Sequence, residues 1–335
     1  MLTLGVGCAD RKLQDLAAPT SASRVGVSVT SATPAHRTVA NAGPETPSVV
    51  QASPIAPMNT DSEPTQLPVG MLFVPGGTFT MGADLGGEED EHPAHSVSVQ
   101  GYWLDITEVP VRDYMECVNA CACAMYRQDV AKSFRAGDDS LFRHPEQPVS
   151  GISWEQAKRY CEYRGKRLPR EAEWERAARG DDNRKYPWGN SAPNSTIHGC
   201  FGRHIGAPLG TTCRVGAYPA GAGPYGHLDL AGNVWEWTAD FYDPLAYRRP
   251  SSDRGEPGNC EQIQETQEWL RHENRQGFTG TNPIPTECER VLRGGAFNYP
   301  ASGLRVTNRV HHPGSWRLLM AGVRCAKDER LTEPR

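Results

Sequence analysis

Ten cysteine residues constrain the fold of this chain more than any other feature of its sequence. No two of them form a C-x2-C pair, so a zinc ribbon is not expected, and their spread predicts disulfide bonds instead. Disulfides form in oxidising compartments, which predicts an exported protein, either periplasmic or at the cell surface. Because short loops cost the least entropy to close, we favour the pairs Cys200–Cys213 and Cys260–Cys288. The sequence leaves open how the cysteines within residues 117–123 pair.

The first 68 residues differ in character from the rest of the chain. A short apolar run ends in Leu4-Gly5-Val6-Gly7-Cys8 and loosely resembles a bacterial lipoprotein box, so Cys8 would carry a lipid anchor if the start codon lies upstream. An ordinary cytosolic N-terminus is the alternative, and the cysteine content argues against it. Residues 11–68 hold eight prolines and no aromatic residue, which predicts a disordered or extended tether. No run of about 18 apolar residues occurs, so we expect contact with a membrane only through the lipid anchor.

The overall composition limits both the architecture and the partners. The 34 glycines and 27 prolines among 335 residues predict many loops and short elements. The formal net charge of -5, without a basic stripe, excludes an electrostatic case for nucleic-acid binding. We therefore expect a protein or a small molecule as the ligand.

Periodicity and capping signals predict several regular elements. Residues 69–82 alternate around a Pro-Gly-Gly turn as in a β-hairpin, and residues 95–109 form a second strand region. The predicted helices begin after Pro110, run from Ser153 to Gly165, and run from Glu171 to Arg179. The acidic run of residues 88–91 is expected to be a solvated loop, and His92 and His95 beside it are expected to be incidental rather than metal ligands.

The stretch Gly226–Asp240, GHLDLAGNVWEWTAD, combines a tight turn with a strand. Gly232 and Asn233 are turn formers, and after them two tryptophans alternate with Glu236. Carboxylate and backbone carbonyl oxygens here are ligands suited to Ca²⁺. The alternative is that the tryptophans fill a core while the carboxylates cap helices or pair with arginines.

Six phrases, in this order, resemble successive signatures of the formylglycine-generating enzyme or sulfatase-modifying factor family. They are FVPGGTFTMG, YWLDITEVPVRDY, PVSGISWEQAKRYCEYRGKRLPREAEWERAARG, YPWGN, GHLDLAGNVWEWTADFY, and VLRGGAFN followed by GVRCA. The resemblance implies one compact α+β domain with a C-type-lectin-like core and little regular secondary structure. We place this domain at residues 69–327, after a tether at 1–68 and before a tail at 328–335.

The resemblance also implies a calcium site and one long-range disulfide. The calcium would be held by the side chains of Asp229 and Glu236 and by the carbonyls of Gly232 and Val234. A second family calcium site would use Asn194, but the aspartate expected shortly after it is missing. The implied disulfide joins Cys161 to Cys325.

The chemistry of the family's namesake enzyme is not expected here. That enzyme binds copper(I) through two cysteine thiolates that follow the Arg-Gly-Gly phrase, and soft thiolates are what copper(I) requires. The two positions fall at Tyr299 and Leu304 in this chain, so neither copper binding nor the standard oxidation is expected. A second branch of the family uses iron on three histidines, partly from an additional helical domain that is absent here. His311 and His312 are adjacent on one strand and point to opposite faces, so we expect no iron either.

Near these positions lies a candidate binding set. Arg293, Arg305, Arg309 and Arg324 carry guanidinium groups that suit an anionic ligand, and pairing with core acids is the alternative that we favour. The remaining members of the binding set are Asn298, His311 and Trp316.

Two departures from the family pattern complete the comparison. Residues 242–289 form a polar insertion anchored by Trp269 and Phe278, and it is a candidate recognition loop stapled by Cys260–Cys288. Arg170 replaces the usual threonine cap, which is expected to weaken the start of the third helix by about 1 kcal/mol.

Three functions follow from these observations. The first is an exported, calcium-stabilised domain that has lost the copper cysteines and binds a protein or small ligand in the ancestral substrate cleft. The second is a divergent metal-dependent oxidoreductase that acts on a protein or thiol substrate. The third is a structural cell-envelope module, which a closed cleft would favour.

Overall fold

The computed structural model describes residues 68–126, 142–204, 210–248, 259–261, 263–265 and 288–329. The predicted tether and the lipid anchor at Cys8 lie outside the described residues, as do Trp269, Phe278 and residues 330–335 of the predicted tail. Among the described residues, no helix has the length and apolar character that crossing a membrane requires.

Three small sheets contain all the strands of the described residues. The first has the order β1-β4-β9 and the second pairs β2 with β3. The third has the order β7-β6-β5-β8, with β8 parallel to β5 and the other pairs antiparallel. The strands are β1 (Met71–Val74), β2 (Gly77–Met81), β3 (His95–Val99), β4 (Tyr102–Asp105), β5 (Trp235–Phe241), β6 (Glu289–Arg293), β7 (Arg309–Pro313), β8 (Ala321–Gly322) and β9 (Ala326–Asp328).

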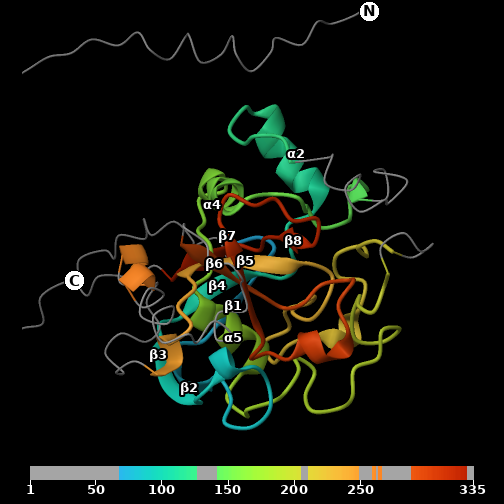
Figure 1. Cartoon of the computed structure of the whole chain (residues 1–335). Coiled ribbons are helices and arrows are strands. Elements are labelled where there is room, and N and C mark those ends of the chain that lie inside the picture. Colours follow the sequence, from blue (N-terminus) through green and yellow to red (C-terminus); the bar gives the residue numbers. More distant parts are fainter. Residues whose placement is uncertain are drawn as a thin grey trace, which may run out of the picture. The chain divides into compact units, whose positions relative to one another are not determined.

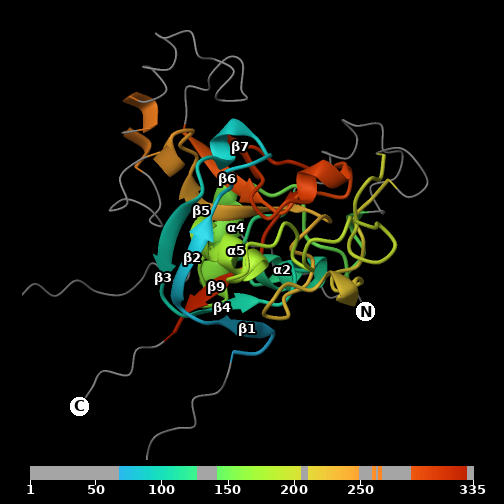
Figure 2. The ribbon, with the colours of Figure 1, turned by 90° about the horizontal axis from the view of Figure 1, so that it is seen from below.

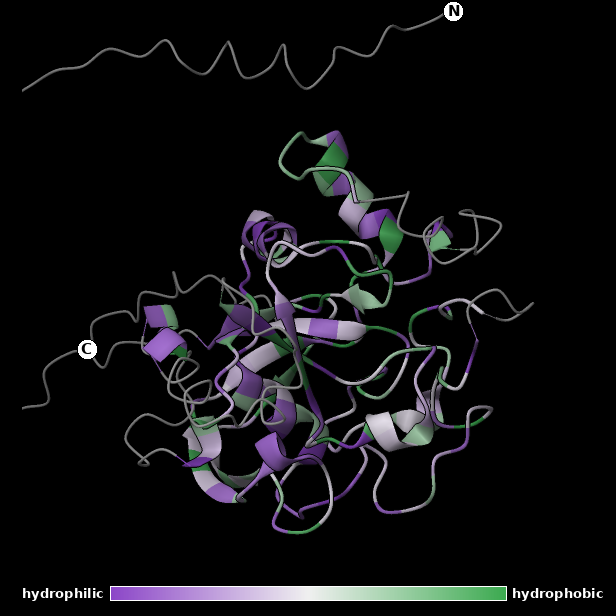
Figure 3. Ribbon diagram, viewed as in Figure 1, coloured by the Kyte–Doolittle hydropathy of each residue, from purple (hydrophilic) through white to green (hydrophobic). Residues whose placement is uncertain are grey.

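Helices cover both sides of the four-stranded sheet. The helices are α2 (Val111–Asn119), α4 (Trp154–Tyr163) and α5 (Glu171–Arg179), with short 3-10 turns at Glu89–Glu91, Pro219–Gly221, Ala246–Arg248 and Ala301–Leu304. Figure 1 shows α4 above this sheet and α5 below it, and Figure 2 gives the view from below. Hydrophobic and hydrophilic residues both occur along α2 (Figure 3), and Val111, Tyr114 and Cys117 of this helix are buried. Because helices pack on small sheets whose strands are mainly antiparallel, the fold is α+β, as the resemblance implies.

The predicted hairpin at residues 69–82 is wrong in its pairing, although both strands exist. β1 pairs with β4 and β2 pairs with β3, so the two strands belong to different sheets. At the junction, Gly77 has φ of 149°, and a Cβ on Gly76 would lie 2.7 Å from the backbone nitrogen of Gly101. The Pro-Gly-Gly segment thus carries the chain from one sheet to the next instead of reversing it.

The three predicted helices are confirmed, and the third has a start that the sequence did not predict. At α4, the Ser153 side chain accepts from the backbone N–H of Gln156 at 3.3 Å. At α5, the carboxylate of Asp240 on β5 accepts from the backbone N–H of Glu171 at 2.6 Å. A side chain from another element therefore satisfies one of the free backbone N–H groups at the start of this helix, where Arg170 stands in place of the usual threonine.

Three tryptophans occupy the core around β5. Trp235 on this strand is 2% exposed, and Trp237 and Trp174 are completely buried. The Cys161–Cys325 disulfide is buried in the same cluster as Trp235 and Trp237, so it links α4 to the segment between β8 and β9.

Candidate functional site

The turn before β5 has the strained backbone that its sequence predicts. Asp229, Gly232 and Asn233 all have positive φ, at 57°, 96° and 62°. Neighbouring segments hold this turn, because Gly232 donates its N–H to the carbonyl of Gly294 and Phe297 donates its N–H to the carbonyl of Asn233. The turn therefore lies directly against the segment that follows the Arg-Gly-Gly phrase.

Glu236 forms a buried ion pair at the end of this turn. The Nε and Nη2 atoms of Arg324 donate to its two carboxylate oxygens at 2.6 and 2.7 Å, and Trp174 Nε1 donates to Oε2 at 2.7 Å. All three side chains are completely buried. The pairing and core-filling roles considered for this stretch are therefore present.

Two further buried carboxylates lie close to Glu236. Asp229 accepts from the backbone N–H of Gly216 at 2.5 Å, and burial raises the pKa of its carboxyl to about 6. Glu108 is 1% exposed, and burial raises its pKa well above the usual value, with Asp229 and Glu236 adding to the effect. One oxygen of Glu108 accepts from Asn233 Nδ2, and its Oε1 has no partner among the described residues.

These groups fit a hard cation in charge and in donor type. Three buried carboxylates face one arginine, and Ca²⁺ prefers oxygen ligands of this kind. Among the described residues, no group of three or more His, Cys, Asp or Glu side chains is arranged to hold a metal ion. The calcium-ligand set that the resemblance implies needs only two carboxylates, because the carbonyl oxygens of Gly232 and Val234 are its other ligands. At the second implied site, Asn194 Oδ1 already accepts from Thr196 at 2.9 and 2.7 Å.

Tyr299 and Leu304, the positions that the resemblance aligns with the family's reactive cysteines, pack against apolar side chains. Tyr299 is partly buried and meets the ring of Trp235 edge-on, with 5.2 Å between the ring centroids. Leu304 is 1% exposed and packs in one cluster with Tyr186, Phe201 and Ala231. Neither side chain offers a soft ligand to copper(I).

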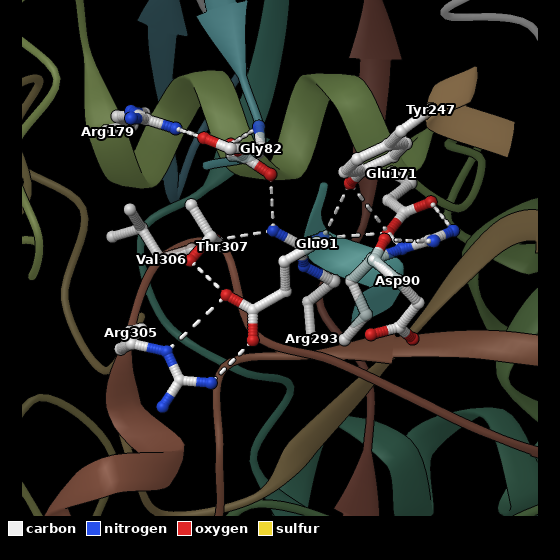
Figure 4. Close-up of polar contacts among 12 residues, drawn as sticks. Gly82, Asp90, Glu91, Glu171, Arg179, Tyr247, Arg293, Arg305, Val306 and Thr307 are labelled. Carbon is white, nitrogen blue, oxygen red and sulfur yellow. Dashed lines mark hydrogen bonds and ion pairs between the residues drawn. The ribbon is translucent and has the colours of Figure 1, made fainter. Parts of the chain in front are cut away.

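The predicted binding arginines pair with buried acids, and Figure 4 shows Arg293 and Arg305 among them. Arg293 donates to Glu171 at 2.7 Å and to Glu175 at 2.6 Å, and Arg309 donates to both oxygens of Glu171 at 2.6 and 3.0 Å. Although burial alone would raise the pKa of Glu171, Arg309 and Arg293 hold it below the usual value. Pairing with core acids, the alternative that we favoured, is what these guanidinium groups do.

The contacts of Arg305 show that the acidic run of residues 88–91 is not wholly exposed. Arg305 Nη2 donates to Glu91 at 2.5 Å, and the Thr307 hydroxyl donates to the same carboxylate at 2.5 Å. Glu91 is completely buried, so the prediction of a solvated loop is wrong for this residue. Tyr242 donates to the neighbouring Asp90 at 2.9 Å.

The other predicted binding residues do not come together at one site. His311 Nδ1 lies 2.6 Å from Glu289 Oε2, and its ring stacks on Tyr242. His312 points to the other face and stacks on Trp316, whose side chain is 48% exposed. Asn298 is partly buried, and its Oδ1 has no partner among the described residues.

The structure contains the three disulfides expected from the sequence. They are Cys161–Cys325, Cys200–Cys213 and Cys260–Cys288. A further bond joins Cys117 to Cys123 in the cluster whose pairing the sequence left open.

Sequence reasoning missed Glu108 as a buried carboxylate, and it considered Asp240 only as one of the carboxylates that would cap helices or pair with arginines. Glu108 follows β4 in a stretch of sequence with no distinctive pattern. It is notable only because it lies close to Asp229 in the folded protein. Asp240 ends the alternating stretch of β5, but no local signal indicates that it caps a helix some 70 residues earlier.

Comparisons with known proteins establish the family. The family model described as "Sulfatase-modifying factor enzyme 1-like domain" matches residues 58–329, and this chain belongs to that family.

The chain resembles relatives with different named activities. The mouse protein named "Inactive C-alpha-formylglycine-generating enzyme 2" is 37% identical over 220 residues, which cover 52% of this chain and 70% of the relative. The formylglycine-generating enzyme of Thermomonospora curvata is 29% identical over 314 residues, covering 79% of this chain and 95% of the relative. The hercynine oxygenase of Mycolicibacterium smegmatis is 30% identical over 291 residues, covering 77% and 61%.

Solved structures support the fold. The structure of PvdO from Pseudomonas aeruginosa is similar with a TM-score of 0.58 and 23% identity, covering 77% of this chain and 94% of that chain. Variable protein 1 of Treponema denticola is similar with a TM-score of 0.52 and 20% identity, with the same coverage.

Proposed function

We propose that this protein is an exported, calcium-stabilised member of the family that lacks formylglycine-generating activity and binds a protein or small ligand in the ancestral substrate cleft. One observation carries the proposal. Tyr299 and Leu304 stand at the positions of the copper-binding cysteines, and both pack against apolar side chains. A phenol and an isobutyl group cannot replace two thiolates on copper(I).

The decisive experiment is a formylglycine assay. The purified protein is incubated with copper, oxygen and a peptide that carries the sulfatase motif, and the enzyme of Thermomonospora curvata serves as the positive control. We expect no mass change at the peptide cysteine with this protein. Conversion of that cysteine would refute the proposal.

Calcium is proposed as a structural ligand rather than a catalyst. Asp229, Glu236 and the carbonyls of Gly232 and Val234 would hold it, and its positive charge would offset the buried carboxylates that Arg324 alone does not balance. The ion supplies charge neutralisation and fixes the turn that precedes β5.

Thermal unfolding tests the calcium site. Because a ligand that binds only the folded state raises the melting temperature, added Ca²⁺ should raise Tm above its value in EDTA. The Asp229→Ala variant should lose this increment, while the control Asp181→Ala, whose side chain is 67% exposed, should keep it. A melting temperature that is the same in Ca²⁺ and in EDTA would exclude the site.

Ligand binding is proposed on two separate side chains that the ion pairs leave available, Asn298 and Trp316. Asn298 has a carbonyl oxygen without a partner among the described residues, and Trp316 exposes 48% of its surface. The burial of Leu304 also favours the alternative of a structural envelope module. A screen of envelope extracts against the wild type and an Asn298→Ala, Trp316→Ala double variant separates the two roles. Binding that the double variant loses supports the ligand-binding role, and the absence of any bound component supports the structural one.

A further inference from the structure

The Cys200–Cys213 disulfide lies beside the segment that carries the family's reactive positions. Gly202 donates its N–H to the carbonyl of Tyr299, and Arg203 donates its N–H to the carbonyl of Phe297, both at 2.8 Å. Cys200 is 1% exposed and packs against Phe297 and Leu319, whereas Cys213 is only partly buried. The two sulfurs thus differ in access, one facing the core and one nearer to solvent.

A tyrosine donates a hydrogen bond to the more accessible sulfur. The hydroxyl of Tyr218 lies 3.4 Å from Cys213 Sγ, and it must be the donor because a disulfide sulfur carries no hydrogen. Arg203 Nη2 in turn donates to the Tyr218 oxygen at 3.3 Å. A hydroxyl polarised by a guanidinium group is suited to stabilise negative charge on a sulfur.

The backbone holds both cysteines whether or not the sulfurs are bonded. Asn233 donates its N–H to the carbonyl of Cys200 at 2.7 Å, and its side-chain oxygen accepts from the N–H of Cys213 at 2.9 Å. Opening the disulfide breaks neither contact. The two thiols would therefore stay side by side, which favours rapid closure of the bond.

The other disulfides between described cysteines lack this environment. Cys161 and Cys325 are both completely buried, and Cys117 and Cys123 are 0% and 8% exposed. None of the sulfurs in those bonds, or in Cys260–Cys288, accepts a hydrogen bond from a described side chain.

We propose that Cys200 and Cys213 form a thiol–disulfide exchange site, with Cys213 as the reacting sulfur and Cys200 as the resolving one. A substrate thiolate attacks Cys213 Sγ, the bond to Cys200 breaks, and Cys200 leaves as a thiolate that takes a proton from water. A second substrate thiolate attacks the substrate sulfur of the mixed disulfide and releases Cys213 as a thiolate held by Tyr218. Two substrate thiols are thereby oxidised to one disulfide while the protein disulfide is reduced to a dithiol.

The reverse reaction with a substrate disulfide restores the bond. The exchange site is independent of the ligand-binding role proposed above. Its substrate class is a thiol or disulfide that reaches the surface beside Cys213.

The first experiment measures which bond opens. The oxidised full-length protein is equilibrated in glutathione buffers of decreasing potential, and each cysteine pair is followed by differential alkylation and mass spectrometry. We expect Cys200–Cys213 to open first, before Cys260–Cys288, which also has a partly exposed cysteine. Opening together with Cys260–Cys288 or after it would overturn the proposal.

The second experiment tests the role of Tyr218. In a Cys200→Ser background, the pH profile of Cys213 alkylation should have a midpoint below the ordinary cysteine value of about 8.5. Loss of a hydrogen bond to a thiolate is worth about tenfold in equilibrium, so Tyr218→Phe should raise the midpoint by about one pH unit. The control Tyr163→Phe, at a side chain that is 41% exposed, should not move it.

An ordinary midpoint that Tyr218→Phe leaves unmoved contradicts the proposal. A readout that does not depend on the Cys200→Ser variant is the reoxidation of reduced wild-type protein by oxidised glutathione at neutral pH. Tyr218→Phe should slow this reaction about threefold, because the loss of thiolate outweighs its higher nucleophilicity. An unchanged rate counts against the exchange site.

Discussion

Replacing Asp240 by asparagine tests how the core tolerates a buried carboxyl at the start of α5. Asp240 is 6% exposed, and burial raises the pKa of its carboxyl from 3.8 to about 7, with the neighbouring Glu171 adding to the shift. Its oxygen accepts from the N–H of Glu171, and the amide oxygen of asparagine can accept the same bond. The change therefore removes the titration while it keeps the cap.

The expected change in the free energy of unfolding follows from the size of the pKa shift. Because the folded-state pKa lies above the unfolded value, the folded protein binds more protons than the unfolded chain between about pH 4 and pH 7. The contribution of Asp240 to stability is therefore present below about pH 4 and is lost as the pH rises through 7. A shift of about three units corresponds to as much as about 4 kcal/mol.

Urea denaturation of the wild type and of Asp240→Asn between pH 4 and pH 8 measures this effect. The stability of the wild type relative to the variant should fall with rising pH by up to about 4 kcal/mol, and most of the change should lie below pH 7. The control Glu162→Gln, at a side chain that is 46% exposed, should show a nearly constant difference. A difference between the wild type and Asp240→Asn that does not change with pH would refute the reasoning.

Three further changes test the core. Arg324→Met should destabilise the protein by about 3–5 kcal/mol in chemical denaturation, because it leaves the buried Glu236 without its partner, and a loss below 1 kcal/mol would contradict this. Leu304→Ala should cost about 2–5 kcal/mol by leaving a cavity, and a neutral result would mean that the position is not packed. His227 is completely buried with its pKa lowered to about 4, so its contribution to stability should be lost as the pH falls from 6.5 to 4, and His227→Gln should remove that dependence in acid titrations followed by circular dichroism.

Local signals predicted the elements better than their pairing. The Ser153 capping box and the spacing of α5 are contained in a few neighbouring residues, so both helices were predictable. The partners of β1 and β2 lie between 14 and 34 residues away in the sequence, and a Pro-Gly-Gly segment is equally consistent with a hairpin and with a crossing between two sheets. Disulfides that close short loops were predictable from loop entropy, whereas Cys161–Cys325, with a separation of 164 residues, needed the family resemblance.

The candidate site was predictable in its residue types but not in their partners. The arginines of β6 and of the segments that follow it were recognisable as a charged set, and the sequence alone left two roles open for them. Burial decides between the roles, since Arg293 is completely buried and can be stable there only with a carboxylate at hydrogen-bond distance. Glu91 pairs with Arg305 in the same way, although it belongs to an acidic run that composition alone predicts to be exposed to solvent.

Between β6 and β7, the residues that stabilise the fold are different from those that would carry the family's chemistry. Arg293 and Arg309 anchor this segment to Glu171 of α5, and this ion pairing does not involve positions 299 or 304. A thiolate at position 304 would be a charged ligand that needs its metal, whereas a leucine there is 1% exposed and adds apolar contact. Under the proposed function, loss of the cysteine pair would remove the reaction without destabilising the fold, because the substituted side chains would make the core independent of a bound copper ion.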